Sequence, residues 1–377
     1  MNSSVPLVDL APAAQLLLIA TLLACVPLAW WWLRQRNTGP RARLAALTAL
    51  TLFLTFDLIV FGAFTRLTDS GLGCPDWPGC YGSASPLGAH AEIHAAQTAM
   101  PTGPVTFSKA WIEMIHRYLA MAVGALILVL TAYSWVNRRL LPHSPWWPTL
   151  TLVWVIVQGL FGKYTVTLKL YPAIVTLHLI GGLVLLALLV HQQARFRASR
   201  LGGDALLRRG LLAGVVVVGL QVALGGWVST NYAVLACSGF PTCNGQWWPQ
   251  ADFADGFTLL RHLGRDGAGD LLAFPALVAI HLVHRVFALV VTAVLIGLAW
   301  RLARAGARVE ARVLMALLAL QIASGLSNVV LGWPLLAALG HTAGAAALIG
   351  WLVHLYARAG STIVQGQPVR ALRPAAI

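Results

Sequence analysis

Long apolar segments separated by short polar ones dominate this sequence. Each of nine such segments approaches or exceeds the roughly 20 residues that a helix needs to cross the hydrocarbon core of a membrane. Two connections, about 68–108 and 230–274, are long enough to cover one end of a helical bundle. The pattern predicts an all-α polytopic membrane protein, with helices over 12–33, 43–67, 110–136, 147–167, 172–193, 207–229, 275–300, 311–332 and 335–357.

The pattern also repeats along the chain. At an offset of 163 residues, the members Cys74, Cys80, Gln158, Gly162 and His178 recur as Cys237, Cys243, Gln321, Gly325 and His341. The segment 113–117 (Glu-Met-Ile-His-Arg) is echoed by 281–285 (His-Leu-Val-His-Arg) at an offset of 168, which implies a five-residue insertion in the second long connection. The first helix has no counterpart.

This repeat predicts two pseudo-symmetric four-helix transmembrane bundles. Because each copy holds an even number of spans, both face the same way and form a parallel internal repeat. We expect an extra N-terminal transmembrane helix in 1–40, bundles in 41–200 and 201–360, and a tail over 361–377.

Composition and charge agree with a membrane protein. Apolar residues make up 58% of the chain and charged residues only 10%, too few for the surface of a soluble protein of this length. The net charge of +14 does not indicate nucleic acid, because the arginines lie in short loops. One set of loops and the tail hold 18 of the 26 basic residues, which predicts a cytoplasmic C-terminus and a periplasmic N-terminus in a bacterial inner membrane.

The paired cysteines lie in the two long connections on the periplasmic side. An oxidising compartment favours a disulfide between two cysteines six residues apart in a loop rich in glycine and proline. We therefore expect Cys74 to pair with Cys80, and Cys237 with Cys243.

Four histidines lie near the periplasmic ends of predicted helices: His116, His178, His284 and His341. An ionisable side chain within a span is costly unless it is paired or liganded. Two histidines facing each other in a four-helix bundle are suited to hold the iron of a haem. Copper or zinc also accepts imidazole, and a hydrogen-bonded packing role is the alternative for any single histidine.

The two copies differ beside these histidines. Glu113 lies one helical turn before His116, whereas the equivalent residue of the second copy is His281. A carboxylate there can act as an acid or base or stabilise positive charge; an ion pair with Arg117 or Lys109 is the alternative. Arg117 and Arg285 can pair with haem propionates or extend to the membrane surface. His90 and His94 in the first long connection can contact a ligand or shuttle protons, and His281 is the one further imidazole that the second copy offers to a metal; the sequence does not choose a role for them.

These residues resemble the haem A synthase family, which oxidises haem O to haem A for terminal oxidases. The resemblance rests on 65–80 (TRLTDSGLGCPDWPGC), 113–118 (EMIHRY), His178, 281–285 (HLVHR) and 341–344 (HTAG), in an order that spans almost all of 43–357. The family's usual eight helices leave the first helix of this chain as an addition.

The resemblance implies a division of roles. His284 and His341 would bind a resident haem b, while His116 and His178 would line the site for haem O as substrate, with Glu113 catalytic or charge-stabilising. One methyl group would be hydroxylated successively and become a formyl group. Expected partners are haem O synthase, a terminal oxidase in assembly and an electron donor that the residues do not identify; a homo-oligomer stays open. The alternative function is a non-catalytic di-haem b-type electron-transfer protein, and a haem transporter is a third hypothesis.

Overall fold

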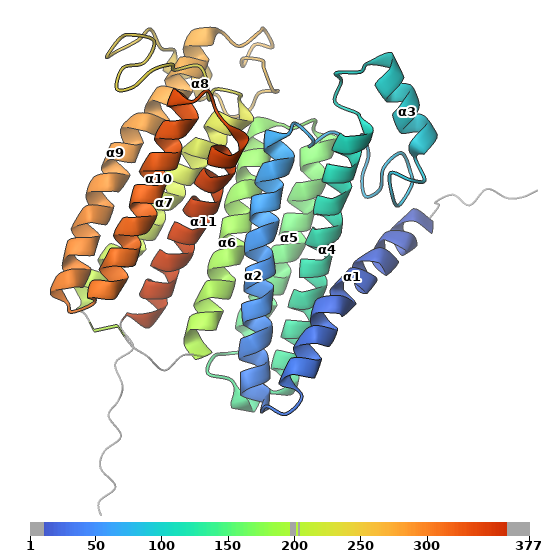
Figure 1. Cartoon of the computed structure of the whole chain (residues 1–377), viewed down its shortest axis with the longest axis vertical. Coiled ribbons are helices and arrows are strands. Elements are labelled where there is room, and N and C mark those ends of the chain that lie inside the picture. Colours follow the sequence, from blue (N-terminus) through green and yellow to red (C-terminus); the bar gives the residue numbers. More distant parts are fainter. Residues whose placement is uncertain (1–10, 197–200, 203, 360–377) are drawn as a thin grey trace, which may run out of the picture.

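The computed structural model describes residues 11–196, 201–202 and 204–359, whose long helices run alongside one another as a bundle (Figure 1). In these residues nine helices are long and apolar enough to span a membrane. The nine are α1 (Ala11–Gln35), α2 (Pro40–Leu67), α4 (Phe107–Val136), α5 (Trp146–Thr167), α6 (Pro172–Phe196), α7 (Ala205–Thr230), α9 (Phe274–Arg304), α10 (Arg308–Val330) and α11 (Leu335–Arg358). The predicted all-α polytopic fold is confirmed, and the tail over 361–377 lies outside the described residues.

The helix boundaries differ from the prediction by up to four residues. The backbone hydrogen-bond ladder continues beyond the apolar stretch, so α9 includes Arg301 and Arg304. At two helix starts, a capping side chain accepts a hydrogen bond from a backbone amide of the first turn, which has no partner within the helix. Thr106 accepts from the amide of Lys109 (3.3 Å) before α4, and Asp204 accepts from that of Leu207 (2.7 Å) before α7.

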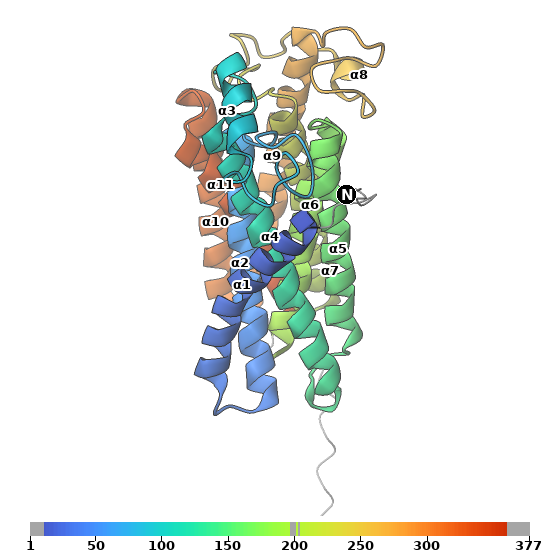
Figure 2. The same ribbon diagram turned by 90° about the vertical axis from the view of Figure 1, so that its right-hand side faces the viewer.

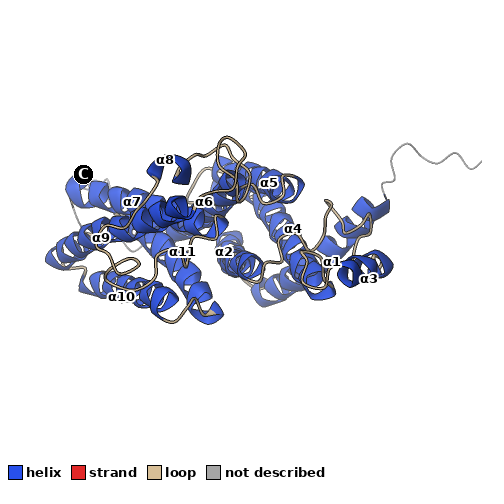
Figure 3. Cartoon of the chain, turned by 90° about the horizontal axis from the view of Figure 1, so that it is seen from above, coloured by secondary structure: helices blue, strands red, loops and turns tan. Residues whose placement is uncertain are grey.

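The eight membrane-spanning helices that follow α1 form two rings of four (Figure 3). In the N-terminal ring, α2 contacts α4 and α6, and α5 closes the ring between α4 and α6; α7, α9, α10 and α11 make the same contacts in the C-terminal ring. The rings meet where α6 packs on α7 and α11, and where α2 packs on α11. Helix α1 lies outside the rings, against α4 and α2 (Figure 2).

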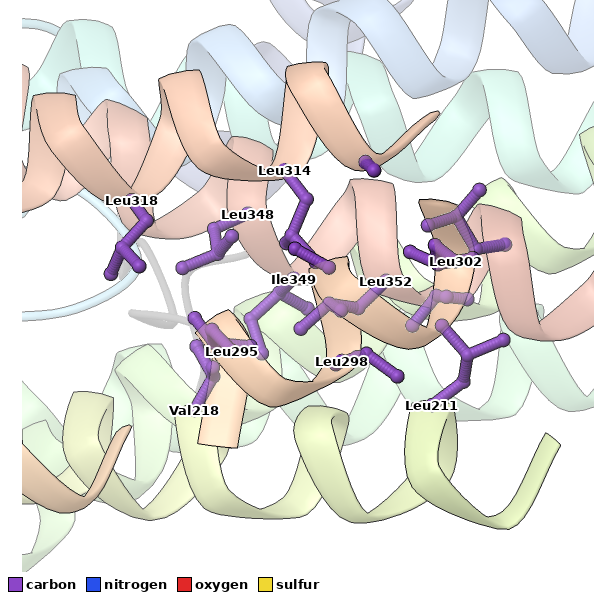
Figure 4. Packing of buried hydrophobic residues seen from close by; sticks show 14 of the residues in the cluster. Leu211, Val218, Leu295, Leu298, Leu302, Leu314, Leu318, Leu348, Ile349 and Leu352 are labelled. Atoms are coloured by element: carbon purple, nitrogen blue, oxygen red, sulfur yellow. The ribbon is translucent and has the colours of Figure 1, made fainter. Parts of the chain in front are cut away.

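Leucine-rich packing fills the half of the C-terminal ring farther from the long connections. Leu295, Leu298 and Leu302 of α9 are at most 4% exposed and interlock with residues of α7, α10 and α11 (Figure 4). Because lipid tails are as apolar as leucine, this interlocking is stabilised by van der Waals contacts between the helices rather than by removal of the side chains from water. This close packing leaves the histidine-bearing segments at the opposite end of the ring.

The two long connections lie at one end of the bundle, here called the disulfide end. They include the short helices α3 (His90–Ala99), which packs on α4, and α8 (Phe253–Gly256), which packs on α9. Cys74–Cys80 and Cys237–Cys243 are both bonded, at S–S distances of 2.07 and 2.09 Å, as the sequence predicted.

Polar contacts tie the two rings together at the disulfide end. Arg66 of α2 donates a hydrogen bond to the carbonyl of Ser229 (2.6 Å), and its guanidinium lies 4.1 Å from the centre of the Tyr232 ring. The Tyr232 hydroxyl donates to Asp69 (2.6 Å). Burial raises the pKa of Tyr232, so this hydroxyl stays protonated as a donor over the physiological range.

Candidate functional site

Four histidines lie near the ends of their helices at the disulfide end of the bundle. His116 follows the start of α4 by nine residues and His284 that of α9 by ten, while His178 and His341 each follow the starts of α6 and α11 by six. At 1.5 Å per residue they lie about 9–15 Å along their helices. All four side chains are half-buried.

The fold brings these histidines together as two pairs. His116 and His178 lie near each other within the N-terminal ring, and His284 and His341 lie near each other in the C-terminal ring. Each pair joins two helices that are separated in sequence, α4 with α6 and α9 with α11. The structure therefore contains two histidine pairs, one in each ring.

A glycine of a neighbouring helix lies against every one of these imidazoles. A Cβ atom on Gly62 would lie 2.9 Å from Nε2 of His116, and one on Gly225 would lie 3.0 Å from Cε1 of His284. Gly162 and Gly325 take the same places beside His178 (3.6 Å) and His341 (3.1 Å). Such cradles fit large rings that must lie close to helix backbones, so the residues present fit a haem between each histidine pair.

The C-terminal pair has hydrogen-bond partners for its ring nitrogens. Gln221 places its Nε2 3.1 Å from Nδ1 of His284, and the Ser324 hydroxyl lies 3.0 Å from Nδ1 of His341. In metal sites, a partner on one ring nitrogen orients the other toward the metal. Neither residue was predicted from the sequence. The signal that could have found them is the 163-residue offset, which aligns these polar residues with apolar ones in the first copy.

The N-terminal pair lies in a more apolar setting. The ring of His116 stacks on Phe61, with 6.3 Å between ring centres, and Nδ1 of His178 has no hydrogen-bond partner among the described residues. An imidazole without such a partner is less fixed in tautomer and orientation. The two pairs thus differ in what surrounds them.

Glu113 is held against the first disulfide loop. Its side chain is only 4% exposed, its Oε1 lies 2.5 Å from Arg117 Nη2, and its Oε2 accepts a hydrogen bond from the amide of Cys74 (2.8 Å). Arg117 in turn donates to the carbonyls of Pro78 (3.2 Å) and Gly79 (2.5 Å). Both carboxylate oxygens are engaged, so Glu113 is a fixed negative charge one turn from His116.

The second loop is held by an arginine without a carboxylate. Arg285 donates to the carbonyls of Gly239 (2.9 Å), Thr242 (3.3 Å) and Cys237, and its Nε lies 3.2 Å from Nε2 of the buried His281. Gly79 and Thr242, which accept from the two arginines, are 163 residues apart. Both arginines therefore anchor disulfide loops above the histidine pairs.

Other predicted candidates lie apart from these contacts. The rings of His90 and His94, both exposed on α3, stack on each other with 6.3 Å between their centres, and His90 packs against Phe107 at the start of α4. In the part of the chain that the structure describes, no group of three or more His, Cys, Asp or Glu residues is arranged to hold a metal ion. The copper or zinc alternative thus gains no support from a ligand cluster.

Paired histidines in glycine-lined rings of membrane-spanning helices define the class: a multi-pass membrane protein with sites suited to haem. Residues 45–353 match the family described as Cytochrome oxidase assembly protein, and the chain belongs to that family. The match begins after α1.

Several relatives carry the name Heme A synthase. The protein of Shewanella oneidensis is 38% identical over 318 residues, which cover 82% of this chain and 95% of that protein. Those of Shouchella clausii (28% identical; 55% and 65% covered) and Sphingopyxis alaskensis (28% identical; 78% and 86% covered) are more distant.

Proposed function

We propose that this protein is a haem A synthase, an oxidoreductase that converts one methyl group of haem O to the formyl group of haem A. The observation that carries the proposal is the match over 45–353, joined to a relative of that name at 38% identity over most of both chains. The paired histidines and glycine cradles fit a substrate of this size and chemistry. Haem O synthase would supply the substrate, and a terminal oxidase in assembly would receive the product.

The two rings would divide the work. His284 and His341 would hold a resident haem b, which supplies one-electron chemistry when bound, while His116 and His178 would hold the substrate. The hydrogen-bonded ring nitrogens of the C-terminal pair support a permanent cofactor there. The carboxylate of Glu113, next to His116 alone, supports chemistry in the N-terminal ring.

Glu113 would act there as a fixed negative charge that stabilises positive charge developing on the substrate. A carboxylate that is buried and held by Arg117 and the Cys74 amide needs no reorganisation when the reaction occurs. Arg117, bound to the loop carbonyls and to Glu113, would set the position of that charge and keep the loop closed over the site.

We also propose that the rings are copies of one parallel repeat. Backbone features recur at the 163-residue offset: positive φ angles at Asp69 and Tyr232 (54° and 56°) and at Leu170 and Trp333 (58° and 67°). The antiparallel bridge Cys80–Ser83 recurs as Cys243–Gln246. Ordinary residues rarely adopt a positive φ, so chance gives a weak explanation for its recurrence.

The basic residues support an orientation with the disulfide end in the periplasm and the C-terminus in the cytoplasm of a bacterial inner membrane. Arg301, Arg304 and Arg308 lie at the end opposite the disulfides, as the positive-inside bias requires. The disulfides then lie on the oxidising side.

The test is to express the full chain with a haem O synthase in a host that makes no haem A, and to analyse extracted haems by chromatography and mass spectrometry. Haem A or its hydroxylated intermediate is expected. Membrane-inserted protein that yields neither compound contradicts the proposal. The alternative, a non-catalytic di-haem protein, predicts haem b in both rings and gives Glu113 only its structural contacts with Arg117 and the Cys74 amide.

A further inference from the structure

Ser324 defines how His341 presents its ring. The Ser324 hydroxyl lies 2.7 Å from the carbonyl of Leu320 and 3.0 Å from Nδ1 of His341. Because a hydroxyl has one hydrogen, donating it to the carbonyl leaves a lone pair to accept the Nδ1 hydrogen of the histidine. The proton is then on Nδ1, and Nε2 keeps the lone pair that an iron ion requires.

Gln221 holds His284 in a related way. Its Nε2 lies 3.1 Å from both Nδ1 and the carbonyl oxygen of His284, and 3.5 Å from Nε2 of the ring. Its Oε1 has no partner among the described residues. Because the carbonyl of His284 can only accept, its bond from Nε2 fixes which end of the amide faces the ring, and Gln221 holds the His284 ring in place from the Nδ1 side.

The equivalent positions of the first copy cannot form these bonds. Subtracting 163 from 221 and 324 gives 58 and 161, which are Leu58 and Phe161. Leu58 packs against the buried side chains of Val123, Ile127 and Leu185. In agreement, Nδ1 of His178 has no partner in the described chain.

We propose that Gln221 and Ser324 are positioning residues that make His284 and His341 permanent haem ligands, whereas Leu58 and Phe161 leave His116 and His178 as exchangeable ligands. Both contacts fix their rings; the Ser324 hydroxyl also accepts the Nδ1 hydrogen of His341, which strengthens the donation of that ring to a metal, and loss of such a partner typically weakens binding roughly 10–100-fold. A resident cofactor needs such retention, whereas a substrate haem must leave after it reacts. This inference rests on the proposed function.

The first test measures haem retention in the purified full-length protein. Ser324→Ala and Gln221→Leu are each expected to transfer haem b to an excess of apomyoglobin roughly 10–100-fold faster than wild type. In Ser324→Ala the midpoint potential of that haem should also become more positive, because a weaker donor stabilises the oxidised iron less. Ser327→Ala, one turn away on α10 with its hydroxyl bonded to the Ser324 carbonyl (2.9 Å), is the matched control and should change neither quantity.

Conservative variants separate positioning from packing. Ser324→Thr keeps the hydroxyl and should retain haem as wild type does. Gln221→Glu offers only oxygens to Nδ1, so the potential should become more negative, a change that a damaged fold does not produce. Wild-type retention and potential in both Ser324→Ala and Gln221→Leu would overturn the proposal.

The reciprocal test adds the bonds to the first ring. Phe161→Ser with Leu58→Gln is expected to slow release of haem A to apomyoglobin roughly 10-fold or more; an unchanged release rate counts against exchangeable ligation.

His284→Ala distinguishes this inference from the function it rests on. If His284→Ala leaves the b-type spectrum intact, the assignment of haem b to this ring fails. If it removes the spectrum while Ser324→Ala and Gln221→Leu retain haem normally, only the present inference fails.

Discussion

The two four-helix rings share a framework and differ at a few positions that face their histidines. Both place two histidines against glycines, and both hold a disulfide loop with an arginine from the histidine-bearing helix. The N-terminal ring has a buried carboxylate at Glu113 where the other has His281. The C-terminal ring has Gln221 and Ser324 where the other has Leu58 and Phe161.

This comparison teaches that a stable scaffold and specialised chemistry can be set by separate residues. Glycines and arginines fix where the rings and loops lie. On the proposed assignment, the polar residues near each imidazole would decide whether a ligand is retained or converted, because hydrogen bonds and charges act strongly in a site shielded from water.

The largest expected effect comes from the histidines themselves. His284→Ala should remove the b-type absorption spectrum of the purified protein, because the iron loses an axial ligand. His116→Ala should keep that spectrum and lose production of haem A. Visible spectra and extracted haems check both, and loss of the b-type spectrum in His116→Ala rather than in His284→Ala would reverse the division.

The next effect concerns the carboxylate. Glu113→Gln should retain haem b and lower turnover roughly 100-fold, in the range found when one group that stabilises transition-state charge is removed. Glu310→Gln is the matched control. Glu310 lies in the first turn of α10, at the end of the bundle opposite the disulfides, and forms an ion pair with Arg358 (3.2 Å). Equal turnover in the Glu113 and Glu310 variants would argue against a chemical role for Glu113.

Removing either disulfide should have a smaller effect, and the effect should differ between the two rings. Each closes a short loop, and its loss should cost about 2 kcal/mol in the free energy of unfolding. Replacing Cys74 and Cys80 by Ser should mainly reduce turnover, whereas replacing Cys237 and Cys243 should mainly reduce bound haem b. Thermal unfolding and spectra measure these effects, and identical profiles for the two double variants would contradict separate roles.

The smallest expected effect comes from one methyl group. Gly225→Ala would place Cβ 3.0 Å from the His284 ring, and such overpacking should cost about 1–3 kcal/mol and lower the bound haem b. Gly219→Ala, on the same helix with nothing within 4 Å, should leave haem unchanged. Equal haem content in the two variants would show that the cradle does not position the ring.

Sequence reasoning was most successful where the physics is local. Apolar length predicted the nine spans, because a helix that crosses a membrane must satisfy its own backbone and present apolar side chains. The spacing of Cys74 and Cys80 predicted a disulfide, which the structure confirms. The roles of the four histidines stay predictions, although their common depth follows from helix starts alone.

The sequence by itself determined the class, the span positions and the cysteine pairing, since all three depend on neighbours along the chain. Only the tertiary structure decided that Glu113 also binds the Cys74 amide, and that Gln221 and Ser324 reach the rings of His284 and His341. Those contacts join residues 17–63 positions apart or lie between a helix and a loop, and their geometry depends on how the helices pack. Periodicity along a single helix carries no information about the side chain that faces it from another.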